Sequence, residues 1–156
     1  MLYVVDEDIF KRPADIYVNP VNCEGICGAG LALTFKRLFP ENYKMYRAEC
    51  ERGRLSPGEV IVRAERSVIT GNTYYICNLA TKDSWKNKSK LEHIRKGMKN
   101  LVRISGDVNA KTVRIPALGC GCGGLNWPDV LKVTEEETIG TDDIDFYLMS
   151  PMRWSN

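Results

Sequence analysis

VNPVNCEGICGAGL, residues 18–31, is the stretch of sequence that decides the fold of this chain. It starts at the end of an apolar, β-branched run and leads through three glycines into a segment with helical periodicity. A second stretch of this kind, PALGCGCGG at residues 116–124, also follows a short apolar run. Glycine lets backbone N–H groups come close to a ligand, and a helix start offers further unpaired N–H groups to an anion. Two such loops predict a ligand with two linked phosphates, or with a phosphate and a sugar.

Apolar runs and turn signals predict strands that alternate with helices. The expected strands are 2–5, 15–19, 59–63, 74–79, 112–116 and 144–149, and the expected helices are 28–37, 40–53, one after Ser89 and one from Trp127. The strands at 59–63 and 74–79 form a possible hairpin. Ser89, with Glu92 three residues later, matches a capping box. This alternation predicts an α/β/α sandwich with its ligand loops at the carboxyl ends of the strands.

The bulk composition is that of one globular domain. The chain has 156 residues, of which 44% are hydrophobic and 27% charged, and its net charge is +2, which alone does not argue for nucleic acid. No apolar run is long enough to cross a membrane, and the acidic start predicts no signal peptide. We therefore expect a single cytoplasmic domain over residues 1–156. Its six cysteines are expected to be free thiols.

The cysteine pairs do not have the spacing of a typical metal site. Cys23 and Cys27 are separated by three residues and Cys120 and Cys122 by one, whereas zinc sites usually use C-x₂-C. The single histidine, His93, lies far from both pairs in the sequence. We expect no metal, and small side chains packed beneath tight loops.

Several polar residues next to these loops have two interpretations. Asn19 and Asn22 flank a proline at a strand end, where their amides either serve a turn or reach a sugar hydroxyl. Asp8 either caps a helix or accepts a hydrogen bond from an exocyclic amine such as that of adenine. Lys82 follows a buried strand, where it is either a solvated charge or a partly desolvated nucleophile or base.

The segment after Lys82 is basic and contains an aromatic residue. Its cationic residues, with only Asp83 and Glu92 to oppose them, are Lys86, Lys88, Lys90, Arg95, Lys96 and Lys99. Such a charge run is usually a solvated helix face. Trp85, however, could stack on a base, so contact with a nucleic acid or a dinucleotide is the second interpretation.

Taken together, these motifs resemble the macrodomain family of ADP-ribose-binding modules. The resemblance runs from Leu2 to about Pro151 and is carried by Asp8-Ile9-Phe10, Asn19-Pro20-Val21-Asn22, Gly28-Ala29-Gly30-Leu31-Ala32 and the run from Ile115 to Gly121. It implies a single three-layer α/β/α sandwich with a central mixed sheet.

Within the family, the chain is most similar to the branch with the DarG antitoxin macrodomain and the human terminal ADP-ribose glycohydrolase. The residues that carry this likeness are the run from Phe35 to Pro40, Thr81-Lys82 and the run from Gly124 to Trp127. The resemblance implies removal of ADP-ribose from a modified macromolecule without metal or cofactor. It also implies release of free ADP-ribose, no membrane and a monomer.

The resemblance also assigns roles to individual residues. Asp8 and Ile9 would hold adenine, Asn22 the distal ribose, and the two glycine loops the pyrophosphate. Lys82 would be the catalytic residue, attacking or activating the anomeric carbon once the ribose ring opens. The positions that it assigns to ADP-ribose binding are Asp8, Ile9, Asn19, Asn22, Gly28, Ala29, Gly30, Leu31, Thr81, Gly119, Cys120, Gly121, Cys122 and Gly123.

One departure bears on the substrate. The human enzyme has an aspartate where this chain has Gly123, whereas the antitoxin branch has glycine. That difference, and the basic segment, favour ADP-ribosylated DNA thymidine over an ADP-ribosylated protein. The alternatives are a binding module without catalysis, and an ADP-ribose 1''-phosphate phosphatase, for which Lys82 would be dispensable.

Overall fold

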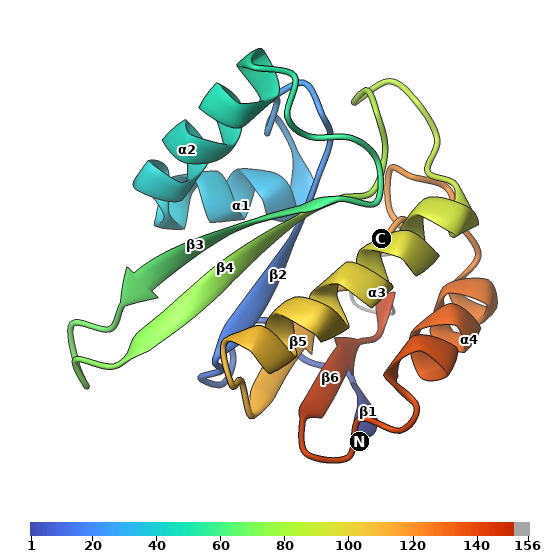
Figure 1. Cartoon of the computed structure of the whole chain (residues 1–156). Coiled ribbons are helices and arrows are strands. Elements are labelled where there is room, and N and C mark those ends of the chain that lie inside the picture. The colour runs from blue at the N-terminus through green and yellow to red at the C-terminus, as the bar shows by residue number, and fades with distance from the viewer. Residues whose placement is uncertain (152–156) are drawn as a thin grey trace.

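The computed structural model describes residues 1–151, which form six strands and four helices (Figure 1). In chain order these are β1 (Leu2–Val5), β2 (Ile16–Val21), α1 (Gly30–Leu38), α2 (Pro40–Glu51), β3 (Val60–Arg66), β4 (Thr73–Ala80), α3 (Leu91–Asp107), β5 (Thr112–Ile115), α4 (Trp127–Thr138) and β6 (Asp145–Met149). Every element that the sequence predicts is present; β1 has its expected bounds, and most other ends differ by one to three residues.

The sheet is mixed, with strand order β1-β6-β5-β2-β4-β3. Neighbouring strands from β1 to β4 run parallel, and only β3 is antiparallel to its neighbour. The pair β3–β4 is the hairpin that the sequence predicts. Because five strands point the same way, the loops that follow them gather at one edge of the sheet.

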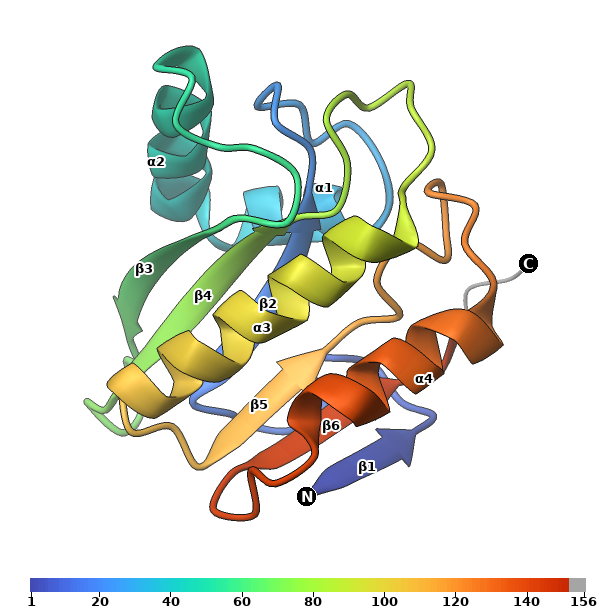
Figure 2. The ribbon, with the colours of Figure 1, turned by 45° about the vertical axis from the view of Figure 1, so that its right-hand side comes forward.

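Helices cover both faces of this sheet, which confirms the predicted three-layer α/β/α sandwich. α3 and α4 lie side by side on one face, and α1 and α2 lie on the other (Figures 1 and 2). Alternate residues of β4 serve the two sides: Cys77 and Leu79 join the core under α3 and α4, whereas Ile76 packs with Phe35 of α1. The period of two in the strand therefore matches the two apolar layers.

Pro20 lies inside β2, one residue beyond the predicted end of that strand. A proline cannot donate a hydrogen bond to a neighbouring strand and is found where a strand edge is unpaired. β2 pairs with β4 along its whole length but with β5 only at Ile16 and Tyr17. Pro20 is tolerated because the sheet has already opened on one side of it, which is the side where ligand loops emerge.

The capping-box prediction for Ser89 is wrong. The residue that caps α3 is Lys90, whose backbone is extended with φ of −115° and whose side chain makes no capping hydrogen bond. Ser89 lies one residue earlier, where its backbone N–H donates to the carbonyl oxygen of Gly123 at 2.9 Å. A contact across the fold, which the local sequence does not reveal, therefore displaces the helix start.

Candidate functional site

The first glycine loop, residues 22–29 between β2 and α1, is organised by Asn22. Its Nδ2 donates to the carbonyl oxygen of Ile26 at 2.8 Å, and its Oδ1 accepts hydrogen bonds from the backbone N–H of Glu24 at 2.9 Å and from the Tyr46 hydroxyl at 3.0 Å. The Asn22 amide thus shapes the loop in this structure. Tyr46, buried in α2, is a loop-positioning residue that the sequence did not single out.

The glycines at the end of this loop border open space. No atom lies within 4 Å of the position that a Cβ would occupy at Gly28 or Gly30, and Gly30 has φ of +58°. α1 begins at Gly30, and its N-cap, Ala29, has no side chain that could bond the first-turn N–H groups. Unpaired N–H groups and the helix dipole attract anions, so this end of α1 is suited to a phosphate.

The second glycine loop, residues 116–126 between β5 and α4, is held by its own backbone. The Leu125 N–H donates to the Gly119 carbonyl oxygen at 2.8 Å, and Gly119 and Gly124 have φ near +74° and +75°. Gly121 borders open space in the same way as Gly28. Cys122 is exposed, whereas Cys120 is half-buried and desolvation raises the pKa of its thiol to about 11.

The loop between β4 and α3, residues 81–90, is bonded to both glycine loops. On one side the Cys23 N–H donates to the Asp83 carbonyl oxygen at 2.9 Å, and the Trp85 N–H donates to Glu24 Oε1 at 2.9 Å. Hydrogen bonds from Ser84 and then from Trp85 lower the pKa of the Glu24 carboxyl. On the other side is the bond from Ser89 to Gly123. The structure thus places this loop between the two glycine loops (Figure 2).

Lys82 stands near the start of this central loop. It follows Thr81, whose N–H donates to the Val21 carbonyl oxygen at 2.9 Å and so continues the ladder between β2 and β4. The Lys82 side chain is half-buried, and its Nζ donates to the Trp85 carbonyl oxygen at 3.1 Å. The side chain is therefore folded along its own loop, where it donates a hydrogen bond to a neutral carbonyl oxygen.

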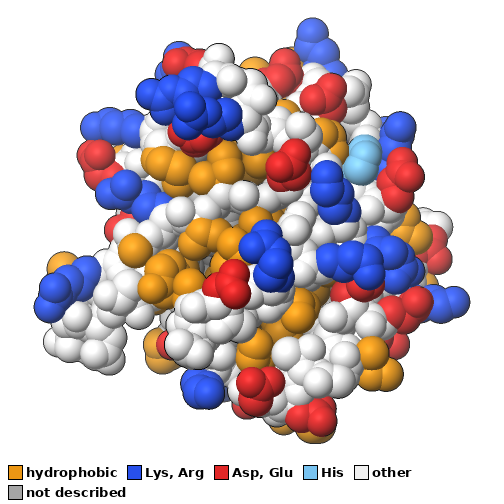
Figure 3. Space-filling view, in the orientation of Figure 1, with side chains coloured by type: hydrophobic (Ala, Val, Ile, Leu, Met, Phe, Trp, Pro, Cys, Tyr) orange, Lys and Arg blue, Asp and Glu red, His pale blue; other side chains and the backbone are white. Residues whose placement is uncertain are grey.

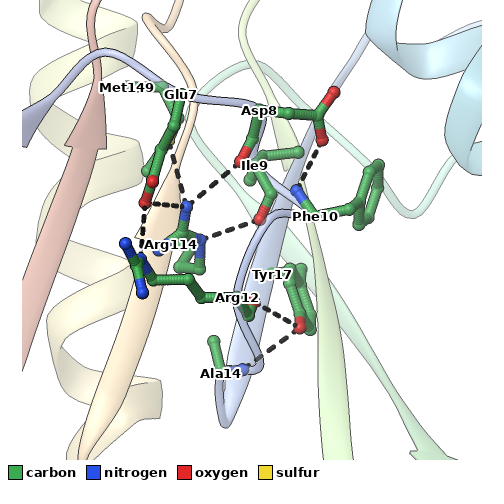
Figure 4. A network of polar contacts seen from close by, with 9 residues as sticks. All are labelled: Glu7, Asp8, Ile9, Phe10, Arg12, Ala14, Tyr17, Arg114 and Met149. Carbon is green, nitrogen blue, oxygen red and sulfur yellow. Dashed lines mark hydrogen bonds and ion pairs between the residues drawn. The ribbon is translucent and has the colours of Figure 1, made fainter.

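The segment that contains Asp8 and Ile9 is fixed by Arg114 of β5, which sequence reasoning missed (Figure 4). Arg114 is only 1% exposed. Its Nε donates to the Ile9 carbonyl oxygen at 2.8 Å, and a terminal nitrogen contacts Glu7 Oε1 at 2.7 Å, the Asp8 carbonyl oxygen at 3.1 Å and Met149 Sδ at 3.6 Å. The signal in the sequence is a lone arginine in an otherwise uncharged, largely β-branched strand.

Asp8 and Ile9 themselves differ in exposure. The Ile9 side chain is buried, whereas Asp8 is exposed and its Oδ1 accepts the backbone N–H of Phe10 at 2.7 Å. In Figure 4 the Asp8 carboxylate points away from Arg114, which binds only the backbone carbonyl of that residue. The Asp8 carboxylate therefore stays at the surface, at the carboxyl edge of the sheet.

Asn19 does not join the loops. Its side chain is 2% exposed and its Nδ2 donates to Asn78 Oδ1 at 3.0 Å, while Asn42 of α2 donates to the same oxygen at 3.0 Å. Asn19 Oδ1 has no hydrogen-bond partner among the described residues. The three buried amides connect β2, β4 and α2 beneath the site, a network that no sequence pattern announces.

Residues 18–134 of the chain match the Macro domain family model. The chain belongs to the macrodomain family. The resemblance drawn from the glycine loops is thereby confirmed, and the mixed sheet is the sheet of a macrodomain.

This macrodomain is similar to several known proteins. A DNA ADP-ribosyl glycohydrolase of Thermus aquaticus is 34% identical over 97% of this chain and 42% of its own length, and one of Mycobacterium tuberculosis is 35% identical over 92% and 40%. The chain thus spans about two fifths of these relatives. The solved macrodomain of Thermus aquaticus DarG superimposes with a TM-score of 0.88, covering 97% of this chain and 99% of that one. Thermosipho africanus DarTG, solved in complex with ADP-ribose, superimposes at 0.87 with 26% identity, covering 96% of this chain and 41% of that one.

Two absences are observed in this macrodomain. Among residues 1–151, no three histidine, cysteine, aspartate or glutamate side chains gather in a group that could hold a metal ion. None of the helices in that range is long and apolar enough to cross a membrane.

Gly123 of this macrodomain has no room for a side chain. A Cβ there would lie 2.6 Å from the Gly119 carbonyl oxygen and 2.9 Å from Gly119 Cα, and still closer to the Ser89 hydroxyl. An aspartate therefore could not be introduced here without moving the loop. Packing, as well as sequence, keeps a carboxylate out of this position.

We expect Gly123→Asp to destabilise the protein by about 1–3 kcal/mol, the usual cost of forcing extra atoms into a packed region. Gly121→Asp is the matched control, because no atom lies within 4 Å of its Cβ position. The measurement is urea unfolding of the two variants beside the wild type. Equal unfolding midpoints for Gly123→Asp and the wild type would contradict this expectation, because they would show that the loop can accept a side chain at residue 123.

Proposed function

We propose that this macrodomain is an ADP-ribosyl glycohydrolase that releases ADP-ribose from a nucleic-acid base, with DNA thymidine as the favoured acceptor. The observation that carries the proposal is the place of Lys82, on the 81–90 loop that is hydrogen-bonded to both glycine loops. Relatives at 34–35% identity that are named DNA ADP-ribosyl glycohydrolase support the same reaction.

In this proposal the pyrophosphate lies between the two glycine loops. The open space at Gly28, Gly30 and Gly121 lets the ligand approach the backbone, and the uncapped start of α1 supplies N–H donors. The Asp8–Ile9 segment holds the adenine, with the exposed Asp8 carboxylate accepting a hydrogen bond from its amine. These donors are fixed before the ligand arrives, so little reorganisation opposes binding.

Lys82 would act at the anomeric carbon of the distal ribose. The ring opens when the bond from this carbon to the ring oxygen breaks and the oxygen takes a proton from solvent. Lys82 Nζ then leaves the Trp85 carbonyl and attacks the carbon as the free amine. The bond from the carbon to the base nitrogen breaks, and the base leaves with a proton from the attacking nitrogen. Water then hydrolyses the imine that links lysine to sugar, which returns the free amine and releases ADP-ribose. The net change is addition of one water across the glycosidic bond.

The proposal is tested with three substrates that differ only in the linkage to ADP-ribose: an ADP-ribosylated thymidine in DNA, a glutamate ester in protein, and ADP-ribose 1''-phosphate. We expect the DNA linkage to be cleaved fastest, with free ADP-ribose as the product by mass spectrometry. Cleavage of the phosphate alone would replace the glycohydrolase by a phosphatase. Binding of ADP-ribose without cleavage of any substrate would leave a binding module.

A further inference from the structure

A pocket of about 620 Å³ lies beside Lys82, between the 81–90 loop and the start of α3. Neither Gly28 nor Gly121 lines it. The side chains that border it and matter to its charge are those of Lys82, Asp83, Asn87, Lys88, Lys90 and His93. Of these side chains, the proposed reaction with ADP-ribose uses only that of Lys82.

The pocket is suited to an anion. Three lysines line it against the single carboxylate of Asp83. α3 starts at its edge, and because Lys90 supplies no capping side chain, first-turn N–H groups of a 17-residue helix lack a side-chain acceptor. In Figure 3 the one histidine lies with both basic and acidic side chains close by, and Glu92 Oε1 is 4.0 Å from His93 Nε2. Charge and helix dipole therefore act in the same direction.

Ser89 supplies a second, independent observation. It lines the pocket and is 6% exposed, and its Oγ, which lies against Gly123, has no hydrogen-bond partner among residues 1–151. A buried hydroxyl without a partner is unfavourable, and native proteins keep few of them. The unpaired group stands in the wall between the pocket and the second glycine loop.

An exposed aromatic side chain lies on the same loop. Trp85 is 51% exposed, and Lys86 Nζ lies 5.5 Å from the centre of its ring. The Trp85 carbonyl oxygen accepts the hydrogen bond from Lys82, so the residue that carries the indole contacts the proposed catalytic amine. Aromatic rings beside basic grooves are the usual platform for single-stranded nucleic acid, because bases stack on them in any sequence.

We propose that this pocket binds a phosphodiester of the strand that carries the ADP-ribose, while Trp85 stacks on a neighbouring base. The inference rests on the proposed function and names where the polymeric part of that substrate lies. An ADP-ribosylated nucleoside has no phosphodiester, so it would fill the ADP-ribose site and leave the phosphodiester position of the pocket empty. The pocket would thus select ADP-ribosylated nucleic acid over ADP-ribosylated small molecules.

The test compares two substrates, ADP-ribosylated thymidine as a nucleoside and the same nucleotide within a single-stranded oligomer of about ten nucleotides. We expect Lys90→Glu and Trp85→Ala each to lower the ratio of kcat/KM for the oligomer to kcat/KM for the nucleoside by about tenfold. Added salt should weaken oligomer cleavage by the wild type more steeply than by Lys90→Glu, because fewer counterions are then displaced. Lys132→Glu, on the exposed surface of α4, is the charge-matched control and should keep the wild-type ratio.

Unchanged ratios for both variants would overturn the proposal. So would an equal loss on both substrates with weaker binding of free ADP-ribose, because the pocket would then belong to the ADP-ribose site. If the wild type cleaves neither substrate, the glycohydrolase proposal fails by itself. Fluorescence anisotropy of an unmodified labelled oligomer then still tests whether the pocket binds a nucleic-acid strand. Tighter binding by the wild type than by Lys90→Glu supports this proposal, and equal binding refutes it.

Discussion

Replacing Lys82 with alanine is expected to lower the rate of ADP-ribose release by about a thousandfold, while binding of free ADP-ribose changes little. The reason is that the donors proposed to hold the ligand are backbone groups of the two glycine loops, whereas the reaction depends on the amine. The measurement is single-turnover cleavage of ADP-ribosylated oligonucleotide, together with calorimetry of ADP-ribose binding. A variant that cleaves at the wild-type rate would remove Lys82 from the mechanism.

Two further variants separate the amine from its charge. Lys82→Arg keeps a cation in the loop but replaces the nucleophile with a guanidinium that does not lose its proton. We expect it to be as inactive as Lys82→Ala, and recovery of activity would indicate that charge alone matters. Because Lys82 Nζ donates to the Trp85 carbonyl, thermal unfolding of each variant shows whether the loop has kept its structure.

The second large effect is expected at Arg114. Changing this buried arginine to methionine leaves the Glu7 carboxylate and the carbonyl oxygens of Asp8 and Ile9 without their common donor. Glu7 keeps Arg12 at 3.3 Å, but the carbonyl oxygens of Asp8 and Ile9 lose their donor, and an unsatisfied buried acceptor costs about 1–3 kcal/mol. We therefore expect Arg114→Met to unfold at much lower urea concentration, and its ADP-ribose affinity to fall because the adenine segment is released.

The control for Arg114 is another arginine in an ion pair. Arg103 lies 3.6 Å from Asp107 and its side chain is 60% exposed, so Arg103→Met should cost less than about 1 kcal/mol. Arg114→Lys keeps the charge but lacks the second arm that reaches Ile9 and Glu7 together. A wild-type unfolding midpoint and a wild-type affinity for ADP-ribose in Arg114→Met would show that the Asp8–Ile9 segment keeps its structure without Arg114.

The same ion pair has a pH dependence. The hydrogen bond from Arg114 is the main cause that lowers the pKa of Glu7 in the folded protein. A carboxyl whose pKa is lowered by folding stabilises the protein above its unfolded value and loses that contribution as the pH falls through the lowered value. Acid unfolding of Arg114→Met should therefore lack this part of the wild-type profile.

The fold and the outline of the site follow from local sequence. Glycines after apolar runs indicated the two glycine loops, the β-prone run at 74–79 indicated β4, and the apolar stripe after Ser89 indicated α3. These signals depend on neighbours within a few positions, so a single sequence contains them. The place of Lys82 at the end of β4 was predictable for the same reason.

The contacts that position the site were not predictable, because their partners lie far apart in the chain. Arg114 bonds residues more than 100 positions away, and its burial depends on β5 lying inside the sheet. Ser89 matched the local pattern of a helix cap, but its backbone N–H donates to the Gly123 carbonyl oxygen instead. The buried amides of Asn19, Asn42 and Asn78 gather only once three elements have packed. Local patterns therefore gave the loops, and tertiary packing set their geometry.

The central claim is tested most directly by one time course on a single-stranded oligonucleotide that is ADP-ribosylated at thymidine. The account predicts that the wild type yields free ADP-ribose and the unmodified oligonucleotide, both identified by mass, and that Lys82→Ala yields neither while still binding ADP-ribose. An intact modified oligonucleotide after prolonged incubation with the wild type, despite tight binding of ADP-ribose, would contradict it.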